Sequence, residues 1–248
     1  MTKLESAISN LVIANRILAN EGVVDAYGHV SIRHPDNPEH YLLSRSRSPA
    51  LVEPGDIMEF DFDGGSVGGD KRPPYLERFI HGGIYSRRPE INAVVHSHAD
   101  DVLPFSVSLT TRMLPVHPVG GMEAHIPVWD IRDKFGDTNL LVTNTEKGRD
   151  LAGALGAKKV VLMSAHGFAA AGRSLLEAVR IAVYLPKNAR VYMEALRLGE
   201  VRVLSPGEIA HQTVKNPDAP EIWRAWEYWA QRAGCGDMLE IPAWARKE

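Results

Sequence analysis

His96 and His98 are side chains that could bind a metal ion. One residue separates them, and they stand at the end of an apolar run over residues 93–96. If that run is a β-strand, side chains at positions i and i+2 point to the same face. Both imidazoles then reach a single ion from one side. A His-x-His pair arises easily by chance in a chain with ten histidines, so the position at a strand end, more than the pair itself, predicts a metal site.

His166 is the candidate for a third ligand. It follows a second apolar run, residues 160–163, and precedes Gly167, whose missing side chain permits close approach of backbone or ligand. Three imidazoles leave coordination positions free for water or substrate, which is typical of a catalytic metal rather than a structural one. The other histidines have no comparable context and are interpreted as surface or core residues.

The elements that must position these side chains follow from apolar spacing, alternation and the turn residues between them. Strands and helices are interspersed, which predicts an α/β or α+β chain with one sheet covered by helices. The spacing predicts helices over residues 4–18, 75–87, 146–155 and 175–197 and from residue 99 onward, and strands over 30–32, 41–43, 57–62, 93–96 and 160–163, with weaker candidates at 128–130 and 140–142.

Length and composition favour a single large domain over residues 1–248, because 248 residues are long for one domain and short for two. From about residue 205 we expect a helical tail that is rich in tryptophan. Its side chains are predicted to pack on the body of the protein or on a neighbouring subunit. The tryptophans concerned are Trp223, Trp226, Trp229 and Trp244.

The charge balance argues against some classes of partner. The net charge is −3, whereas a nucleic-acid binder is usually basic. No apolar run approaches the roughly 18–20 residues that span a bilayer, and the first residues lack a signal-peptide pattern. Cys235 is the single cysteine, so an internal disulfide is excluded and a cytoplasmic location is expected. The expected partner is therefore a small molecule, not nucleic acid or a membrane.

Residues 75–98 resemble the central motif of the class II aldolase/adducin family. In that motif a glutamate opens a helix, a Tyr…Arg-Pro turn follows, and a strand delivers His-x-His; here Glu77 lies 19 residues before His96. The His166-Gly167 step matches the later histidine of the family. Residues 28–31, Gly-His-Val-Ser, match its Gly-Asn-apolar-Ser loop in part, and the similarity covers about residues 4–195.

The resemblance implies a three-layer αβα fold with a central, mainly antiparallel sheet. It also implies a homotetramer with active sites at subunit interfaces and a divalent ion on His96, His98 and His166. Family members share the formation of a metal-bound enolate, and Glu77 would be the catalytic acid/base. Taken alone, Glu77 has a simpler interpretation, a carboxylate stabilised by the dipole of the helix that it opens.

The sequence departs from the phosphate-binding members of the family at three places. His29 replaces an asparagine, residues 44–48 read Ser-Arg-Ser-Arg-Ser, and Tyr75-Leu76 replaces a serine pair. Arginine presents a planar fork that suits a carboxylate, and Tyr75 with Leu76 would flank a flat ring. The alternative for the arginines is a solvated loop. The predicted substrate-binding residues are His29, Ser31, Arg45, Ser46, Arg47 and Tyr75.

These departures are similar to the family branch that decarboxylates hydroxylated aromatic or pyridine carboxylates. We therefore expect a metal-dependent decarboxylase of an aromatic or heteroaromatic (di)carboxylate, with Mn²⁺ favoured and Zn²⁺, Fe²⁺ or Co²⁺ as alternatives. A lyase of the aldolase type, acting on a sugar phosphate or a 2-keto acid, is the second hypothesis. A non-catalytic scaffold like adducin is the third, although it predicts loss of ligands that are all present.

Overall fold

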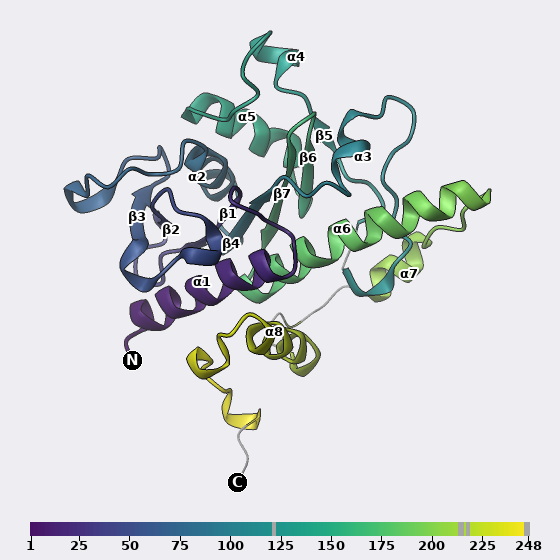
Figure 1. Ribbon diagram of the computed structural model, residues 1–248. Coiled ribbons are helices and arrows are strands. Elements are labelled where there is room, and N and C mark those ends of the chain that lie inside the picture. The colour runs from purple at the N-terminus through teal and green to yellow at the C-terminus, as the bar shows by residue number, and fades with distance from the viewer. Residues whose placement is uncertain (121–122, 213–215, 217–218, 246–248) are drawn as a thin grey trace.

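The computed structural model describes residues 1–120, 123–212, 216 and 219–245, and Figure 1 shows helices on both faces of a central sheet. Seven strands form the sheet in the order β3-β2-β1-β4-β7-β6-β5. All neighbours are antiparallel except β5 and β6, which are parallel. The strands are β1 (His29–Arg33), β2 (His40–Ser44), β3 (Ile57–Asp61), β4 (Ala93–Ser97), β5 (Val128–Trp129), β6 (Val160–Met163) and β7 (Gly167–Gly172).

Helices cover both faces of this sheet. They are α1 (Lys3–Asn20), α2 (Arg78–Arg87), α3 (Leu103–Val107), α4 (Arg132–Phe135), α5 (Thr145–Leu155), α6 (Leu175–Leu198), α7 (Pro206–His211) and α8 (Pro220–Arg232). In the described residues α1, α6 and α8 pack on one face, and α2 and α5 pack together on the other (Figure 1). The predicted three-layer αβα fold with a mainly antiparallel sheet is confirmed.

Alternation along β4 divides the interior into two cores. Ala93 and Val95 point into the core beneath α1 and α6, whereas Val94 points into the core beneath α2 and α5. By the same period of two, His96 shares the face of Val94. This face is also the one that α2 covers, and Glu77 is the N-cap residue of α2. Because side chains alternate along β4, the His96 side chain lies on the same face of the sheet as Glu77.

The tryptophan-rich tail packs largely on the body of its own chain. Trp223, Trp226 and Trp229 on α8 are buried in the core that α1 and α6 share, while Trp244 is 55% exposed. The helical tail expected from about residue 205 begins with α7 and continues in α8. Among the described residues, no helix has the length and apolar character that crossing a bilayer requires.

The structure corrects three of the predicted elements and adds one strand. Residues 140–142 form coil instead of a strand, because their polar groups serve the functional site described below. The helix expected from residue 99 begins at Leu103, and α2 begins at Arg78 rather than residue 75, where Pro73 and Pro74 hold the chain extended. Strand β7 was not predicted, because its sequence, Gly-Phe-Ala-Ala-Ala-Gly, has low β-propensity.

Candidate metal centre

Three imidazoles and one carboxylate converge where β4, the β6–β7 turn and the start of α2 meet. Nε2 of His98 lies 2.9 Å from Nε2 of His96 and 3.1 Å from Nε2 of His166. One ligand atom from each histidine and one from Glu77 all lie within 4.8 Å of one another. Nitrogens about 2.1 Å from a shared ion stand roughly 2.9–3.4 Å apart, so the two measured separations fit ligands of one metal.

Backbone carbonyls orient two of the rings. Nδ1 of His96 donates to the carbonyl oxygen of Phe168, and Nδ1 of His166 donates to that of Leu140, both at 3.0 Å. A neutral ring whose Nδ1 hydrogen is used in this way presents Nε2 as a lone pair, the form in which histidine binds metals. The protein thus fixes the tautomer as well as the direction of both rings.

The turn between β6 and β7 brings His166 to the centre. Ala165 adopts a left-handed conformation with φ of 55°, and Gly167 has φ of 154°. A Cβ atom at Gly167 would lie 2.1 Å from the carbonyl oxygen of Ser97, so glycine is required for the close approach of the turn to β4. The His-Gly step in the sequence therefore has a steric cause.

Glu77 is buried beside the three histidines. Its Oε1 accepts the backbone N–H of Val142 at 2.9 Å, and its Oε2 lies 3.5 Å from Nε2 of His96 and 3.3 Å from Nε2 of His166. Burial alone raises the pKa of this carboxyl, but positive charge on the side of His166 and His96, which a cation among these atoms would supply, outweighs burial and holds the pKa below its ordinary value. Glu77 is therefore a carboxylate at neutral pH.

The donor set fits a divalent cation. With both Nδ1 hydrogens used on carbonyls, Nε2 of His96 and Nε2 of His166 face His98 as lone pairs, and His98 can donate a hydrogen to only one of them. The other lone pair and the Glu77 carboxylate beside it then repel each other. A cation among these atoms removes that repulsion, and burial helps to keep His98 neutral by lowering its pKa to about 4.

A cavity of about 250 Å³ opens beside Glu77 and His98. Most of its wall is aromatic or apolar, and it includes three of the predicted substrate-binding residues, His29, Ser46 and Tyr75. The remaining lining residues are Tyr27, Gly28, Leu76 and Leu141. The cavity therefore directly adjoins His98, one of the candidate metal ligands, and Glu77, the candidate acid/base.

A buried chain of hydrogen bonds runs behind His29. Nδ1 of His29 lies 2.7 Å from Nε2 of His81, Nδ1 of His81 lies 2.6 Å from Oγ of Ser31, and that Oγ lies 2.8 Å from the hydroxyl of Tyr85. All four side chains are at most 4% exposed. Burial, with His81 and His96 nearby, lowers the pKa of His29, and burial lowers that of His81 to about 3, so both rings are neutral.

The direction in which these hydrogen bonds are donated is set at Tyr85, where the series of bonds ends. Among the described residues, the Tyr85 hydroxyl hydrogen has Ser31 as its acceptor. Tyr85 therefore donates to Ser31, Ser31 to Nδ1 of His81, and His81 through Nε2 to Nδ1 of His29. His29 must then carry its own hydrogen on Nε2, since the opposite direction would leave a buried hydroxyl unsatisfied. His29 is thereby fixed as a hydrogen-bond donor in the wall of the cavity.

The structure does not bring Arg45 and Arg47 into the cavity. Nε of Arg45 and Nη1 of Arg47 each lie 2.6 Å from a carboxylate oxygen of Asp56. The backbone carbonyl of Arg47 accepts a hydrogen bond from the Tyr75 hydroxyl. These ion pairs and this hydrogen bond hold the loop that carries Ser46 in place. Ser31 likewise lies behind His29 instead of at the cavity surface.

The sequence interpretation missed His81 and Tyr85. Residues 77, 81 and 85 are spaced by four, which places them along one face of a helix. His81 was interpreted as a surface or core histidine, and it is completely buried. The helical spacing from Glu77 was the signal that would have placed His81 and Tyr85 beside the site.

Comparison with known proteins decides the family. The model of the class II aldolase and adducin N-terminal domain matches residues 9–193. The chain belongs to the class II aldolase/adducin family. Decarboxylase tropJ of Talaromyces stipitatus is 31% identical over 244 residues, covering 90% of this chain and 92% of the relative.

Other members of the family differ in their reactions. The 3,4-dihydroxyphthalate decarboxylase of Arthrobacter keyseri is 29% identical, covering 76% of this chain and 78% of the relative. The 5-methylthioribulose-1-phosphate/5-deoxyribulose-1-phosphate aldolase of Rhodospirillum rubrum is 30% identical, covering 79% and 89%. The structure of L-fuculose 1-phosphate aldolase from Glaciozyma antarctica PI12 superposes with a TM-score of 0.74 at 23% identity, covering 93% and 89%. This class II aldolase-family chain is thus similar to lyases.

Proposed function

We propose that this lyase is a divalent-metal-dependent decarboxylase of hydroxylated aromatic or heteroaromatic carboxylates. The cavity beside the metal centre carries the proposal. Rings of Tyr27, His29 and Tyr75, with the apolar side chains of Leu76 and Leu141, form walls suited to a flat ring. Two decarboxylases among the relatives support the same reaction class.

The composition of the cavity argues against a phosphorylated substrate. Among the described residues that line it, none is a lysine or an arginine, and Ser46 is its one aliphatic hydroxyl. Phosphate sites in proteins are built from several backbone, hydroxyl or cationic donors. An aldolase acting on a sugar phosphate is the second candidate, favoured by the aldolase relative at 30% identity.

The ion would be held by His96, His98 and His166, and when bound it would supply Lewis-acid stabilisation of negative charge. We favour Mn²⁺, followed by Zn²⁺, with Fe²⁺ and Co²⁺ as alternatives. A homotetramer with sites at subunit interfaces is part of the proposal. Tyr27 and Leu76, which line the cavity, are 70% and 65% exposed in the single chain. Large exposed apolar side chains of this kind are typical of a surface that a second subunit covers.

Glu77 would move one proton between two atoms of the substrate. As a carboxylate it accepts the hydrogen of the hydroxyl ortho to the substrate carboxylate. It then donates this proton to the ring carbon that bears the carboxylate, which gives a β-keto acid. The bond to the carboxylate breaks, CO₂ leaves, and the electron pair returns to the ring oxygen, which takes a proton from solvent. This sequence requires one residue that is first base and then acid.

His29 would assist as a donor. The hydrogen-bond chain from Tyr85 fixes its hydrogen on Nε2, and a preorganised N–H in the wall of the cavity stabilises charge on a substrate oxygen without reorganisation. Tyr75 and Leu76 would hold the ring and exclude water. For a substrate with a second carboxylate, we propose that Arg45 or Arg47 leaves Asp56 to bind it.

The test is a panel of substrates with purified, Mn²⁺-loaded protein. The panel contains 3,4-dihydroxyphthalate, 2,3-dihydroxy-p-cumate, 3-hydroxy-2-methylpyridine-4,5-dicarboxylate and two sugar phosphates, with CO₂ and ring absorbance measured together. We expect CO₂ from an aromatic acid, lost after chelation and lowered at least roughly a hundredfold in Glu77→Gln. Glu146→Gln, an exposed carboxylate on α5, is the matched control. Aldehyde release from a sugar phosphate without CO₂ would establish the aldolase instead.

A further inference from the structure

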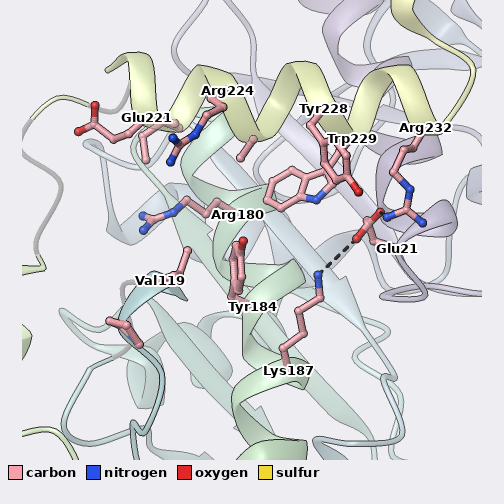
Figure 2. A pocket seen from close by; sticks show the side chains of 13 residues that line it. Glu21, Val119, Arg180, Tyr184, Lys187, Glu221, Arg224, Tyr228, Trp229 and Arg232 are labelled. Carbon is pink, nitrogen blue, oxygen red and sulfur yellow. Dashed lines mark hydrogen bonds and ion pairs between the residues drawn. The ribbon is translucent and has the colours of Figure 1, made fainter.

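A second cavity, of about 650 Å³, lies between α6, α8 and the 3-10 turn Pro118–Gly120 (Figure 2). It shares no lining residue with the cavity at the metal centre. Arg180, Tyr184 and Lys187 contribute from one face of α6 at helical spacing, and α8 contributes from the opposite side. Nothing in the proposed reaction uses these side chains.

The charges of this second cavity are unbalanced. Its lining contains four cationic side chains, Arg180, Lys187, Arg224 and Arg232, and two carboxylates, Glu21 and Glu221. Glu21 neutralises one end, because its carboxylate lies 3.4 Å from Nζ of Lys187 and 2.8 Å from Nη1 of Arg232. Each end therefore keeps a surplus of one positive charge, and at the other end Glu221 belongs to the same lining as Arg180 and Arg224.

Arg180 and Arg224 occupy that other end. Figure 2 shows both guanidinium groups directed into the space between α6 and α8, away from the Glu21 ion pairs. Among the described residues, neither has an ion-pair partner within 4 Å. Burial lowers the pKa of the half-buried Arg180 by more than Tyr184, Glu177 and Glu221 nearby raise it. A planar fork without a partner is a ready site for a carboxylate.

Aromatic rings lie between the two charged ends. The rings of Tyr184 and Trp229 contact each other at an interplanar angle of 54°, with centroids 5.9 Å apart, and Trp229 is buried. Tyr184 also stacks on His117. Tyr228 extends the aromatic surface along α8 (Figure 2). A ligand with a flat apolar body would contact these rings while its acidic group reaches Arg180 and Arg224.

We propose that this cavity is a second binding site, separate from the metal centre, for a small aromatic carboxylate. The guanidinium groups of Arg180 and Arg224 bind the carboxylate, and Tyr184 and Trp229 pack on the ring. The assignment does not rest on the proposed reaction, because it follows from the charges and rings of this cavity alone.

Calorimetric titration with phthalate tests the proposal, using the metal-loaded protein and the same protein after chelation. We expect one site per chain to persist after chelation, with an affinity at least tenfold above that for benzamide, which lacks the charge, and for inorganic phosphate, which lacks the ring. Arg180→Gln should weaken this site roughly ten- to hundredfold. Arg224→Gln, at an exposed position where folding is not at risk, should weaken it in the same direction.

Arg197→Gln is the matched control, because Arg197 lies on the same helix, is 70% exposed and pairs with Glu194. It should leave phthalate binding unchanged. Equal affinity in Arg180→Gln and Arg197→Gln would overturn the proposal, as would a site that disappears with the metal. Equal binding of benzamide would also overturn it, because the carboxylate would then contribute nothing to binding. Equal binding of phosphate would do the same for the aromatic ring.

Discussion

Nδ1 of His29 lies 2.7 Å from Nε2 of His81, and this contact connects the cavity wall to the buried hydroxyl of Tyr85. Tyr85→Phe removes the donor that fixes the direction of the chain. The hydrogen of His29 then distributes between its two nitrogens, and we expect kcat to fall roughly tenfold or less with little change in KM. Imidazole ¹⁵N shifts should report the mixed tautomer, which a purely structural role would not produce.

Tyr192→Phe is the matched control for that change. Tyr192 is also buried, but it stacks on Phe105 and takes no part in the hydrogen bonds between Tyr85 and His29. It should alter neither the ¹⁵N shifts nor kcat. An unchanged tautomer in Tyr85→Phe would show that the direction of the chain is set elsewhere.

Chelation should lower the thermal stability of the protein. A metal bound only by the native state stabilises it by about 2.7 kcal/mol at a free concentration of 100 times Kd. For a domain of this size, Tm should therefore fall by roughly 5–10 °C when the metal is removed. Calorimetric scans of His166→Ala should lose this increment, while exposed His211→Ala keeps it. An increment that survives in His166→Ala would remove His166 from the ligand set.

Gly167→Ala should destabilise the fold more than the same change at Gly199. Both glycines have positive φ, 154° and 130°, so alanine meets backbone strain at each. At Gly199 nothing lies within 4 Å of the new methyl group, and we expect a loss of about 1 kcal/mol. At Gly167 the methyl would overlap the Ser97 carbonyl, and the loss should reach roughly 3 kcal/mol or more. Equal losses in denaturant titrations would contradict the steric argument.

Asp56→Asn should cost stability at neutral pH but not in strong acid. Burial alone raises the pKa of Asp56, but hydrogen bonds from the backbone of Glu53 and from Arg45 and Arg47 outweigh it, so the folded pKa lies below the unfolded value. The stabilisation is complete above about pH 4 and is lost as the pH falls through the folded pKa.

We expect a loss of about 1–2 kcal/mol at pH 7, limited by solvent screening because both arginines are partly exposed. Unfolding titrations at pH 7 and below pH 3 measure the difference. Asp137→Asn, at an exposed position with no ion-pair partner among the described residues, should change stability little at either pH. A cost for Asp56→Asn that is independent of pH would mean that the carboxylate charge is not its source.

Arg47→Gln distinguishes substrates with one and with two carboxylates. If Arg47 leaves Asp56 to bind a second carboxylate, KM for 3,4-dihydroxyphthalate should rise roughly tenfold or more, while KM for 2,3-dihydroxybenzoate stays within about twofold. An equal rise for both acids would mean that Arg47 acts through the loop carrying Ser46.

The sequence predicted the three candidate ligands that the structure brings together, because their placement is local. His96 and His98 follow from the period of two along one strand, and His166 from the end of another. The direction of His29 was not predictable, because it depends on Tyr85 through two intervening side chains. The ion pairs of Arg45 and Arg47 were missed for a related reason, since Asp56 approaches them only when β2 and β3 pair.

Strand β7 shows a different limit of the sequence. Its small residues form a strand because β4 and β6 pair with it on both sides, and that tertiary requirement overrides low β-propensity. Residues 140–142 show the opposite case, since their apolar run, Leu-Leu-Val, suggests a strand. The backbone groups of Leu140 and Val142 are instead used by His166 and Glu77.

That short segment constrains how the enzyme can diversify. Leu140 accepts the hydrogen of His166 through its carbonyl, Leu141 lines the cavity, and Val142 donates its N–H to Glu77. An insertion or deletion there would displace His166, the cavity wall and Glu77 together, the three parts on which the proposed function depends. Under the proposed function, exchange of the Leu141 side chain would alter the cavity alone, whereas a change in the length of this segment would alter all three roles together.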